Sequence, residues 1–383
     1  MRFLQQKDPG MVKNKVLLRR RVLMWGGSAL AASVIPRSVR AQSLSGFDPL
    51  KSPAIAVKSP TTAFLVGCTL TPGGRLVAVG EHGVIIYSDD NGQTWHQANV
   101  PVNVTITCVN FATARRGWAA GHFGVILITD DGGKTWITQL NGIQAAKLTL
   151  EAAQNQDGQD NSCPCTEYAL KRAEFFVQAG PDKPFLCIII LSPQEVIVFG
   201  AYRLAMRTTD GGKTWTDWSL HIYDKLSHNL YDAATIGSDV YLVAEKGLVF
   251  VSKDHANTFL PLAPTSDTTL FGILGCHGGG LLVYGVAGVV FRSVDKGQNW
   301  LPVSVNVQDD ITSGCVLFSG EILLATESGV VLASKDNGIT FTALSGLPPR
   351  PIYGIQKLPD DSVMTVGADG VALISNIKLA FPS

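Results

Sequence analysis

Six aspartates recur in one local setting, and their carboxylates are the first groups to consider for chemistry. Each stands two residues after Ser or Thr and two before Gly, which is Ala in one copy, and an aromatic residue follows three positions later. Asp-rich turns can bind calcium. The Thr or Asn that precedes the aromatic residue favours another role, in which the polar side chains close the turn by hydrogen bonding to nearby backbone N–H groups. We therefore assign a structural role to these aspartates and to the tryptophans of the motif: Asp90, Asp131, Asp210, Asp254, Asp295 and Asp336, with Trp95, Trp136, Trp215 and Trp300.

A second group with chemical potential consists of histidines, tyrosines and one arginine in short connections between apolar strands. Loops on a rigid scaffold often carry binding residues. Imidazole and aromatic groups gathered on one rim favour a protein-partner site and do not define a reaction. We expect this partner face to comprise His82, His122, Tyr202, Arg203, His221, Tyr223 and His228.

No motif of an enzyme or a cofactor site occurs in the sequence, which contains no G-x-S-x-G, Walker loop, H-E-x-x-H or EF-hand pattern. We therefore expect no catalytic residue, no cofactor and no metal. The seven cysteines leave one exception open. Five are expected as small buried residues in strands, whereas Cys163-Pro-Cys165 could be redox-active or bind a metal, although it lacks the usual two-residue spacer of a zinc half-site.

The spacing of the motif indicates the elements that must position these residues. Successive aspartates lie 41, 79, 44, 41 and 41 residues apart, and a unit of about 40–45 residues is the size of one four-stranded propeller blade. A strand, a tight turn and a strand precede each motif, and a seventh copy of this pair ends at Ser375. Seven copies predict an all-β, seven-bladed β-propeller over residues 42–383, with the Asp motif in the turn between the third and fourth strands (C–D) of each blade.

Apolar residues often run without alternation in these strands, as in Cys187–Leu191, which is typical of strands buried on both faces. No blade can bury its faces alone, so stacking into a closed ring supplies the core and removes the exposed edges at the ends of the array. The last blade lacks a fourth strand. We expect Ser52–Lys58 to supply it, and Ile377–Phe381 is the alternative.

The interval of 79 residues indicates an insertion between blades 2 and 3, from about residue 141 to residue 184. Within it, residues 166–179 place Leu170, Ala173 and Val177 at helical spacing, with Arg172 on the outward face. This helix could lie on the propeller wall or serve as a docking arm. It leaves from a connection between strand D of one blade and strand A of the next, on the face that also carries the B–C turns.

Residues 1–41 are predicted to be an export signal outside the fold. Arg19-Arg20-Arg21 precedes an apolar stretch of about 14 residues, which is too short to span a bilayer, and a small-x-small pattern ends at Ala41. The paired arginines and the Gly26–Ser28 interruption favour twin-arginine export over general secretion. We expect the mature chain in the periplasm, or in the thylakoid lumen if the organism is a phototroph.

The charge of the mature chain argues against some partners. The whole sequence has 31 basic and 31 acidic side chains, but the export signal holds nine of the basic ones and a single acid, which leaves a net charge of −8 for the rest. This opposes nucleic-acid or anionic-membrane binding as a main role. No other stretch looks transmembrane, and we expect a monomer.

The second repeat, Ala114–Trp136, reads ARRGWAAGHFGVILITDDGGKTW. This string resembles the photosystem II assembly and stability factor family, whose seven-bladed propellers carry the motif above as the BNR repeat or Asp box, and which has relatives in many non-photosynthetic bacteria. The resemblance implies a non-enzymatic assembly or scaffold factor for a membrane-associated protein complex. The residues that carry it are Arg116, Gly117, Trp118, Gly121, Gly124, Thr129 and Asp131–Trp136.

Two other functions remain alternatives. Asp boxes also occur in sialidases, a class of glycoside hydrolase in which three arginines grip the carboxylate of a sugar acid. The mature chain has eight arginines, and Arg115 and Arg116 fall in an A–B turn, on the wrong face for such a site. A small molecule or a carbohydrate could instead bind in the axial pocket of the propeller.

Overall fold

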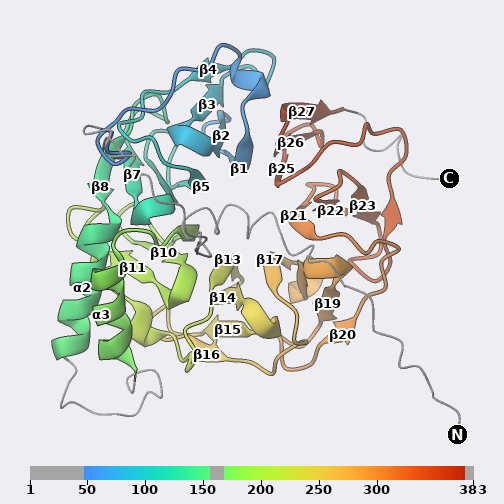
Figure 1. Ribbon diagram of the computed structural model, residues 1–383. Coiled ribbons are helices and arrows are strands. Elements are labelled where there is room, and N and C mark those ends of the chain that lie inside the picture. The colour runs from blue at the N-terminus through green and yellow to red at the C-terminus, as the bar shows by residue number, and fades with distance from the viewer. Residues whose placement is uncertain (1–46, 156–167, 376–383) are drawn as a thin grey trace, which may run out of the picture. The chain divides into compact units, whose positions relative to one another are not determined.

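The computed structural model describes residues 47–155 and 168–375. Residues 1–41, predicted to be an export signal, lie outside the described residues, as do Cys163, Cys165 and Ile377–Phe381, the alternative prediction for the last strand. The chain forms seven antiparallel sheets arranged around one axis (Figure 1). The predicted all-β, seven-bladed propeller is confirmed.

In the six complete blades the strands follow chain order from A at the centre to D outside. Blades 1 to 3 comprise β1 (Leu65–Leu70), β2 (Leu76–Gly80), β3 (Ile85–Ser88), β4 (His96–Gln97); β5 (Ile106–Phe111), β6 (Gly117–Gly121), β7 (Ile126–Thr129), β8 (Ile137–Leu140); and β9 (Phe185–Ile190), β10 (Val196–Gly200), β11 (Ala205–Thr208), β12 (Thr216–Asp217). Blades 4 and 5 comprise β13 (Leu230–Ile236), β14 (Asp239–Ala244), β15 (Val249–Ser252), β16 (Leu260–Pro261); and β17 (Leu270–Gly275), β18 (Leu281–Gly285), β19 (Val290–Ser293), β20 (Leu301–Pro302). Blades 6 and 7 comprise β21 (Ile311–Val316), β22 (Ile322–Thr326), β23 (Val331–Ser334), β24 (Thr342–Ala343); and β25 (Gly354–Lys357), β26 (Val363–Gly367), β27 (Gly370–Ile374).

The last blade has three strands in the described part of the chain. Ser52–Lys58 does not complete it, so that prediction is wrong. This segment is not a strand and lies along the outside of blade 1, where the Ala54 N–H donates to the Val100 carbonyl at 3.0 Å. The side-chain amide of Gln97 holds it there by donating to the Ile55 carbonyl and accepting from the Val57 N–H.

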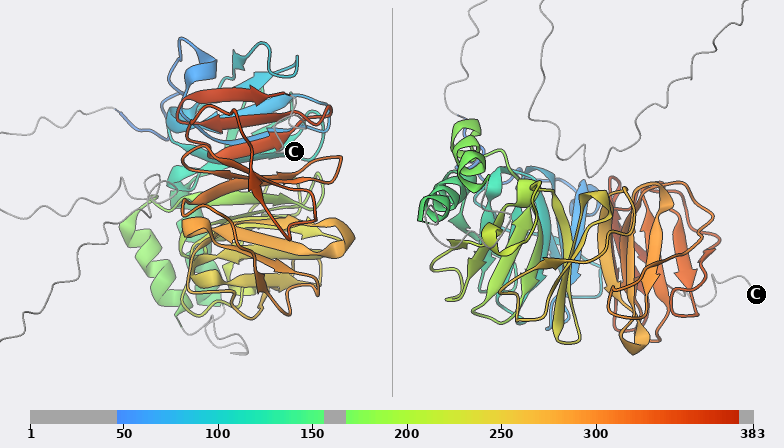
Figure 2. Two further views of the ribbon diagram at one scale, coloured as in Figure 1. Left: turned by 90° about the vertical axis from the view of Figure 1, so that its right-hand side faces the viewer. Right: turned by 90° about the horizontal axis from the view of Figure 1, so that it is seen from below.

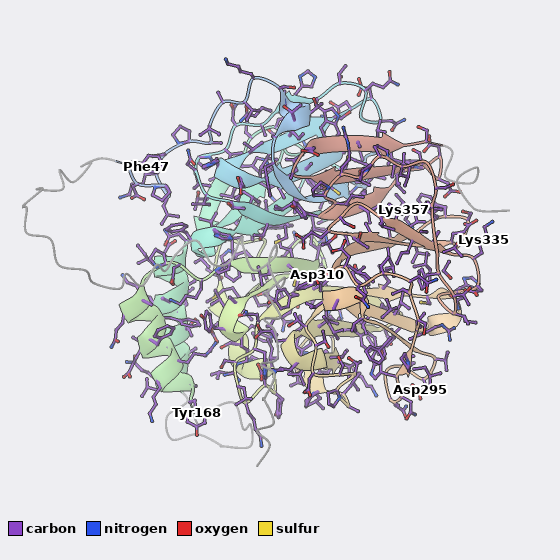
Figure 3. The ribbon with its side chains drawn as sticks, turned by 45° about the vertical axis from the view of Figure 1, so that its right-hand side comes forward. Phe47, Tyr168, Asp295, Asp310, Lys335 and Lys357 are labelled. Atoms are coloured by element: carbon purple, nitrogen blue, oxygen red, sulfur yellow. The ribbon has the colours of Figure 1, made fainter. Side chains whose placement is uncertain are left out.

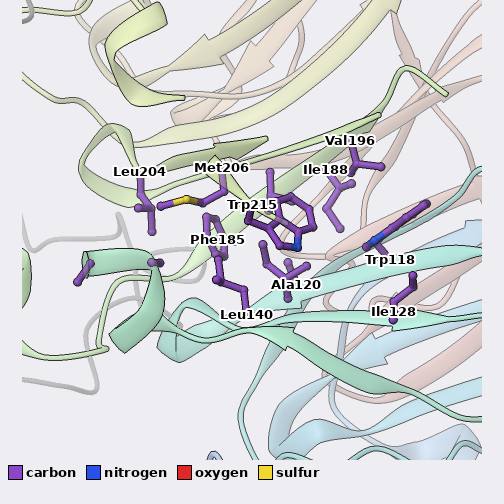
Figure 4. Close-up of a cluster of buried hydrophobic side chains, with 14 of the residues drawn as sticks. Trp118, Ala120, Ile128, Leu140, Phe185, Ile188, Val196, Leu204, Met206 and Trp215 are labelled. Atoms are coloured by element: carbon purple, nitrogen blue, oxygen red, sulfur yellow. The ribbon is translucent and has the colours of Figure 1, made fainter. Parts of the chain in front are cut away.

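The core consists of apolar layers between neighbouring blades. Figure 4 shows the layer between blades 2 and 3, where Trp118, Phe185 and Trp215 are buried among aliphatic side chains of both sheets. The ring closes where β1 lies beside β25, and there the rings of Phe64 and Tyr353 stack with centroids 5.5 Å apart. Burial on both faces of each sheet explains the apolar runs in the sequence.

The six Asp boxes close their turns with the same bonds. In each, the Ser or Thr hydroxyl donates to one carboxylate oxygen of the Asp at 2.7–2.9 Å, and the backbone N–H four residues after the Asp donates to the same oxygen at 2.8–3.0 Å. The side chain of that fourth residue bonds the other oxygen. Figure 3 labels one of these aspartates, Asp295, in the turn between β19 and β20. Hydrogen bonds from Asn299 and Ser293 lower its pKa to about 2.

The insertion between blades 2 and 3 is confirmed and contains two helices, α2 (Gly142–Asn155) and α3 (Ala169–Ala179). Helix α2 has no clear signal in the sequence, because its buried residues, such as Ala145, Ala146 and Thr149, are too small or polar to produce an apolar periodicity. A capping box marks its start: the Ile143 and Gln144 N–H groups donate to Asn141 Oδ1, and the Asn141 N–H donates to Gln144 Oε1. Neither helix has the length and apolar character that crossing a bilayer requires, nor has any other described helix.

The second helix agrees with the predicted one over 169–179, but its orientation differs. Ala169, Ala173 and Phe176 are buried, whereas Val177 is exposed. Arg172, predicted to point outward, donates hydrogen bonds to blade 3. Its long stem and five N–H donors can satisfy backbone carbonyls that an apolar side chain would leave without partners.

Candidate functional site

The B–C turns carry most of the predicted partner face, and they share an unusual backbone. In five of them the second residue is not glycine and yet has a positive φ of 54–58°: His82, Phe123, Tyr202, Lys246 and Ala287. Left-handed backbone costs about 1–2 kcal/mol for residues with a Cβ. Each of these five turns therefore carries the free-energy cost of a left-handed residue at its tip. This backbone holds the five side chains at fixed positions on one face of the ring.

Blade 3 departs from this pattern at the next position. Four of these turns continue with a positive-φ glycine, but blade 3 has Arg203 there, with φ 59°. The Arg203 side chain is only 1% exposed. Its guanidinium donates to the carbonyl of Asp224, and its backbone N–H donates to the His228 carbonyl at 2.9 Å. Strained backbone and a buried charge therefore coincide at one turn, which suits a specialised site better than a generic connection.

A second arginine reaches the same turn from the insertion. The Arg172 guanidinium in α3 donates to the carbonyls of Tyr202 and Arg203 at 3.1 and 3.3 Å and to the Ser219 hydroxyl. Burial and the neighbouring Arg172 charge lower the pKa of Arg203 to about 10, although Asp224 and Asp217 act in the opposite direction. The insertion is thus fixed to blade 3 through charged groups.

Asp224, which pairs with His228, supplies the acidic group of the cluster in the connection between blades 3 and 4. His228 Nδ1 lies 2.8 Å from Asp224 Oδ1, and the His228 N–H also donates to this carboxylate. Burial alone would raise the pKa of Asp224, but the bonds from His228 hold it below its usual value. The same side-chain bond raises the pKa of His228.

An aromatic patch lies above this charged cluster, and we define it as Phe175, Phe176, Tyr202 and Lys183. The Tyr202 ring meets both phenylalanine rings edge-on, with centroids 6.3 and 6.4 Å away. Lys183 Nζ lies 4.7 Å from the Phe175 ring centre and 5.5 Å from that of Phe176. Phe176 and Lys183 are buried, but Phe175 and Tyr202 are each 49% exposed.

Figure 1 shows α2 and α3 side by side next to blade 3, and in Figure 2 both project on one face of the ring. The turn after β6 contacts α2, where the space beside Gly124 is filled by Gly142. Thr149 on α2 donates to Asp217 Oδ2 in β12 at 2.8 Å. Both helices therefore position the aromatic patch by contacts with two blades.

The structure brings together only part of the predicted face. Tyr202, Arg203 and His228 meet in the cluster above. His82 and His122 lie in the turns of blades 1 and 2, each within its own surroundings; burial lowers the pKa of His122 to about 4.

His221 and Tyr223 belong to a different surface. His221 stacks on Trp218 at 3.6 Å and its Nδ1 lies 2.8 Å from the Asn257 carbonyl in the Asp box of blade 4. The Tyr223 N–H donates to the Phe259 carbonyl at the end of the same box. The segment crosses the outer wall of the propeller before it returns to the B–C face at Asp224, because the connection follows the outer strand of blade 3.

The site also contains residues that were not predicted from the sequence as site residues: Arg172, Asp217, Asp224, Phe175 and Lys183. One signal was present: blade 3 reads Tyr202-Arg203 where the aligned turns of blades 1 and 2 read His-Gly and Phe-Gly. A residue other than glycine at a position that needs positive φ indicates a compensating environment. The positions of Arg172, Phe175 and Lys183 depend on how the insertion packs against blade 3, and the repeat pattern contains no information about that packing.

The arginines outside this cluster do not converge on the axis. Arg75 and Arg116 each pair with an aspartate of their own blade at 2.6 Å, and Arg75 also donates to the Gly132 carbonyl of the next blade. Arg207 bonds Glu195 and Asn257 between blades 3 and 4. These arginines therefore link blades in separate places and do not form the three-arginine clamp of a sialidase.

The described residues contain no cluster of three or more side chains arranged to hold a metal. Cys68, Cys276 and Cys315 are free thiols, and burial raises the pKa of each, to about 11 for Cys276 and about 12 for Cys315. Thiols with raised pKa are poor nucleophiles at neutral pH. The surface depression between blades 1 and 2, about 400 Å³, is lined by Arg75, Arg115 and Lys134 together with Asp89 and Asp131.

Comparisons with known proteins agree with this fold. The BNR/Asp-box repeat profile matches residues 86–97, and among curated proteins none matches the chain. YCF48 bound to D1 peptide is similar with a TM-score of 0.58 and 19% identity, over 86% of this chain and 97% of that one. YCF48 from Cyanidioschyzon merolae has a TM-score of 0.59 and 15% identity, over 82% and 96%.

The GH74 xyloglucanase from Xanthomonas campestris is similar with a TM-score of 0.61 and 13% identity, over 86% of this chain and 54% of the enzyme. At such identities the likeness establishes architecture alone, since propellers host both enzymes and binding proteins. The chain is a seven-bladed β-propeller of BNR/Asp-box repeats with a helical insertion after blade 2.

Proposed function

We propose that the chain is an exported, non-enzymatic propeller that binds a protein segment of a membrane-associated complex, as an assembly or scaffold factor. The binding surface is the B–C face at blade 3, where the aromatic patch stands on the insertion. The fold likeness to YCF48 bound to D1 peptide supports a peptide-binding role, and the residues of the patch carry the argument for its location.

The observation that carries the proposal is that Phe175 and Tyr202 are half exposed yet held in fixed contacts. Exposed aromatic side chains with few free rotamers bind partners at a low cost in conformational entropy. Lys183 places a cation against the rings, and Arg172 fixes the turn beneath them. A partner strand or helix that presents apolar side chains matches the two exposed rings.

Tyr202→Gly tests the site without straining the turn, because glycine adopts the positive φ of this position freely. We expect the variant to fold and to lose at least ~10-fold in affinity for its client, the effect of removing one binding hot spot. The matched control is Leu301→Ala, which removes an exposed apolar side chain from blade 5. Site-specific photo-crosslinking from position 175 in the native host identifies the client, and its affinity for purified variants is then measured by titration.

Equal affinity of the Tyr202→Gly variant and the parent protein would refute this location. Crosslinks that form equally well from position 301 would show that the contact is unspecific. Turnover of a fluorogenic sialoside or xyloglucan oligosaccharide by the purified protein would replace the proposal with an enzymatic one.

Export is the second part of the proposal and rests on residues 1–41. Substitution of Arg20 and Arg21 by Lys keeps the charge but removes the paired guanidinium groups. We expect the precursor to accumulate in the cytoplasm while the unchanged protein is found in the periplasm, or in the lumen of a phototroph. Unaffected export of the variant would favour general secretion.

A further inference from the structure

The fourth residue of each Asp box forms the tip of its turn, and in five boxes a residue of the preceding blade holds this tip. The contacts are Gly132 with Arg75, Gly211 with Gln139, His255 with Glu195, Lys296 with Asp239, and Asn337 with His277 and Arg292. The tip of the first box is Asn91, which is exposed and makes no hydrogen bond or ion pair within the described residues. The first box therefore differs from the other five in the restraint on its tip.

This difference has a chemical consequence, because Asn91 precedes a glycine. The sequence contains three Asn-Gly pairs, which begin at Asn91, Asn141 and Asn337. Asparagine is thermolabile, and a glycine that follows it has no Cβ to shield its backbone nitrogen. An Asn-Gly pair is therefore the place in a chain where the backbone nitrogen most readily reaches the side-chain carbonyl carbon of Asn.

The three pairs differ in what holds the Asn side chain. Asn141 Oδ1 accepts two backbone N–H groups at the start of α2. Asn337 Oδ1 accepts the His277 N–H at 2.8 Å, and the Asn337 amide donates to the His277 carbonyl at 3.0 Å. Because no bond of this kind restrains Asn91 in the described part of the chain, its side chain is free to turn towards the next backbone nitrogen.

We propose that Asn91 is a modification site, at which the side-chain amide is lost through a cyclic imide formed with Gly92. The Gly92 nitrogen gives its proton to solvent base and attacks Asn91 Cγ, so that an N–Cγ bond forms and the side-chain nitrogen leaves as ammonia. Water then opens the imide at one of its two carbonyls and leaves aspartate or isoaspartate. Both reacting groups belong to one chain, so ring closure needs only their correct orientation.

One bond in the box opposes this reaction, but it does not distinguish the sites on the Asp-box face. The Gly92 N–H donates to Ser88 Oγ at 2.8 Å, which slows removal of its proton. The Gly338 N–H donates to Ser334 Oγ at 2.9 Å in the same way. Since the backbone nitrogens are held alike, the restraint on the Asn side chain decides which of these two boxes reacts.

The modification weakens the first box where it meets blade 7. Isoaspartate lengthens the backbone of the turn, so the box bonds of the Gly92 and Thr94 N–H groups no longer fit. Either product also adds a carboxylate beside Asp89 and Asp90, and like charges repel. The side chain of Leu373 in β27 packs against Gly92, so the loosened turn lies at the junction of blades 1 and 7.

Timed incubation of the folded mature chain 42–383 at mildly alkaline pH, followed by peptide mapping with mass spectrometry, tests the proposal. We expect Asn91 to lose its amide at least ~10-fold faster than Asn141 or Asn337, because the hydrogen bonds of those two must break before Cγ can turn. In the denatured chain the three sites should react at similar rates. Equal rates in the folded protein, or no reaction at Asn91 while the denatured chain reacts, would overturn the proposal.

The products identify the route. The cyclic imide gives isoaspartate together with aspartate, and its formation accelerates as pH rises, whereas aspartate alone would show direct hydrolysis and contradict the proposed step. Asn91→Gln is the matched variant, because it keeps an amide but disfavours ring closure, and His255 and Lys296 show that other side chains adopt positive φ at this position. We expect the variant to stop the reaction at position 91 and leave the rate at Asn337 unchanged.

Hydrogen exchange measures the effect on the box. In incubated parent protein the Thr94 amide should exchange at least ~10-fold faster than in fresh protein, as for a turn opened to solvent. The Thr340 amide, which makes the equivalent bond in box 6, should not change. Incubated Asn91→Gln protein should match its fresh sample at both amides. Unchanged exchange of Thr94 in protein that carries isoaspartate would show that the box tolerates the modification and would refute this consequence.

Discussion

The two faces of the ring are built in different ways. On the Asp-box face six turns repeat one set of hydrogen bonds, even where Ala256 replaces the glycine and adopts φ 60°. On the B–C face the turns share a backbone but differ in side chains, and blade 3 combines Arg203, the insertion and the aromatic patch. The repeated Asp-box bonds indicate what each of these blades needs to close its own turn. The residues that differ in blade 3 indicate where one blade has been specialised.

Removing a carboxylate from an Asp box should cost the most. Asp131→Ala deletes an acceptor for two backbone N–H groups and two hydroxyls, so we expect a loss of about 2–4 kcal/mol in the free energy of unfolding. Denaturant titration measures it. The control is Asp130→Ala, next in sequence, whose exposed pair with Arg116 should contribute less than about 1 kcal/mol. Equal effects of the two changes would contradict the structural role of the box.

Loss of the Arg172 charge should weaken the specialised face locally. Arg172→Met keeps the apolar stem but removes the bonds to the Tyr202 and Arg203 carbonyls, which we expect to cost about 2 kcal/mol because relief of repulsion from Arg203 offsets part of the loss. Hydrogen exchange of α3 should accelerate while the Asp boxes stay protected. Lys171→Met, an exposed neighbour, should change neither, and acceleration throughout the ring would show that the insertion is not a local unit.

As the pH falls, protonation should destabilise the B–C face at a higher pH than it destabilises the Asp boxes. The folded-state pKa of His122 is about 4, below its ordinary value of 6.5, so the unfolded chain takes up the proton first and stability falls as pH drops from 6.5 towards 4. We expect this residue to contribute about 1–2 kcal/mol to that loss, reduced by its partial exposure. Denaturant titrations over this pH range should show a flatter stability profile for His122→Gln than for the parent protein. The Asp-box carboxylates of Asp90, Asp210 and Asp336, with pKa about 2, stay ionised throughout.

The smallest effect separates backbone strain from side-chain use. Ala287→Gly, in the B–C turn of blade 5, should stabilise the fold by about 1 kcal/mol, because glycine relieves the positive φ and no large side chain is lost. Tyr202→Gly relieves the same strain but removes the ring contacts with Phe175 and Phe176, so its net effect on thermal unfolding should be near zero. A clear gain in stability at Tyr202 would mean that its ring contributes little to the patch.

Much of the architecture could be predicted from the sequence, because each blade repeats local chemistry. The spacing of Asp90 to Asp336 encodes the blade length, and Gly or Ala256 at the fifth position encodes the turn. The interval before Asp210 locates the insertion but not its first helix. The fourth strand of blade 7 was assigned to the wrong segment, since nothing in Ser52–Lys58 shows that Gln97 would hold it on blade 1.

The site was predictable only in part. Tyr202, Arg203 and His228 share the same cluster, because the connection to blade 4 passes directly beside the turn of blade 3, where the Arg203 N–H donates to the His228 carbonyl. His221 and Tyr223 lie elsewhere, since a periodicity argument does not follow the path of a long connection. Arg172 illustrates the main limit: its helical position suggested a solvent-facing side chain, and its inward course depends on unpaired carbonyls that only the folded turn presents.

The two ends of the insertion lie next to each other: a Cβ built on Gly142 would come within 2.8 Å of Pro181 Cα. A module whose entry and exit nearly touch can be cut out or transplanted with a very short linker and little strain on its host. The helical pair is thus a separable module. Its binding surface can be redesigned by replacing the residues between Gly142 and Pro181 while the propeller is left unchanged.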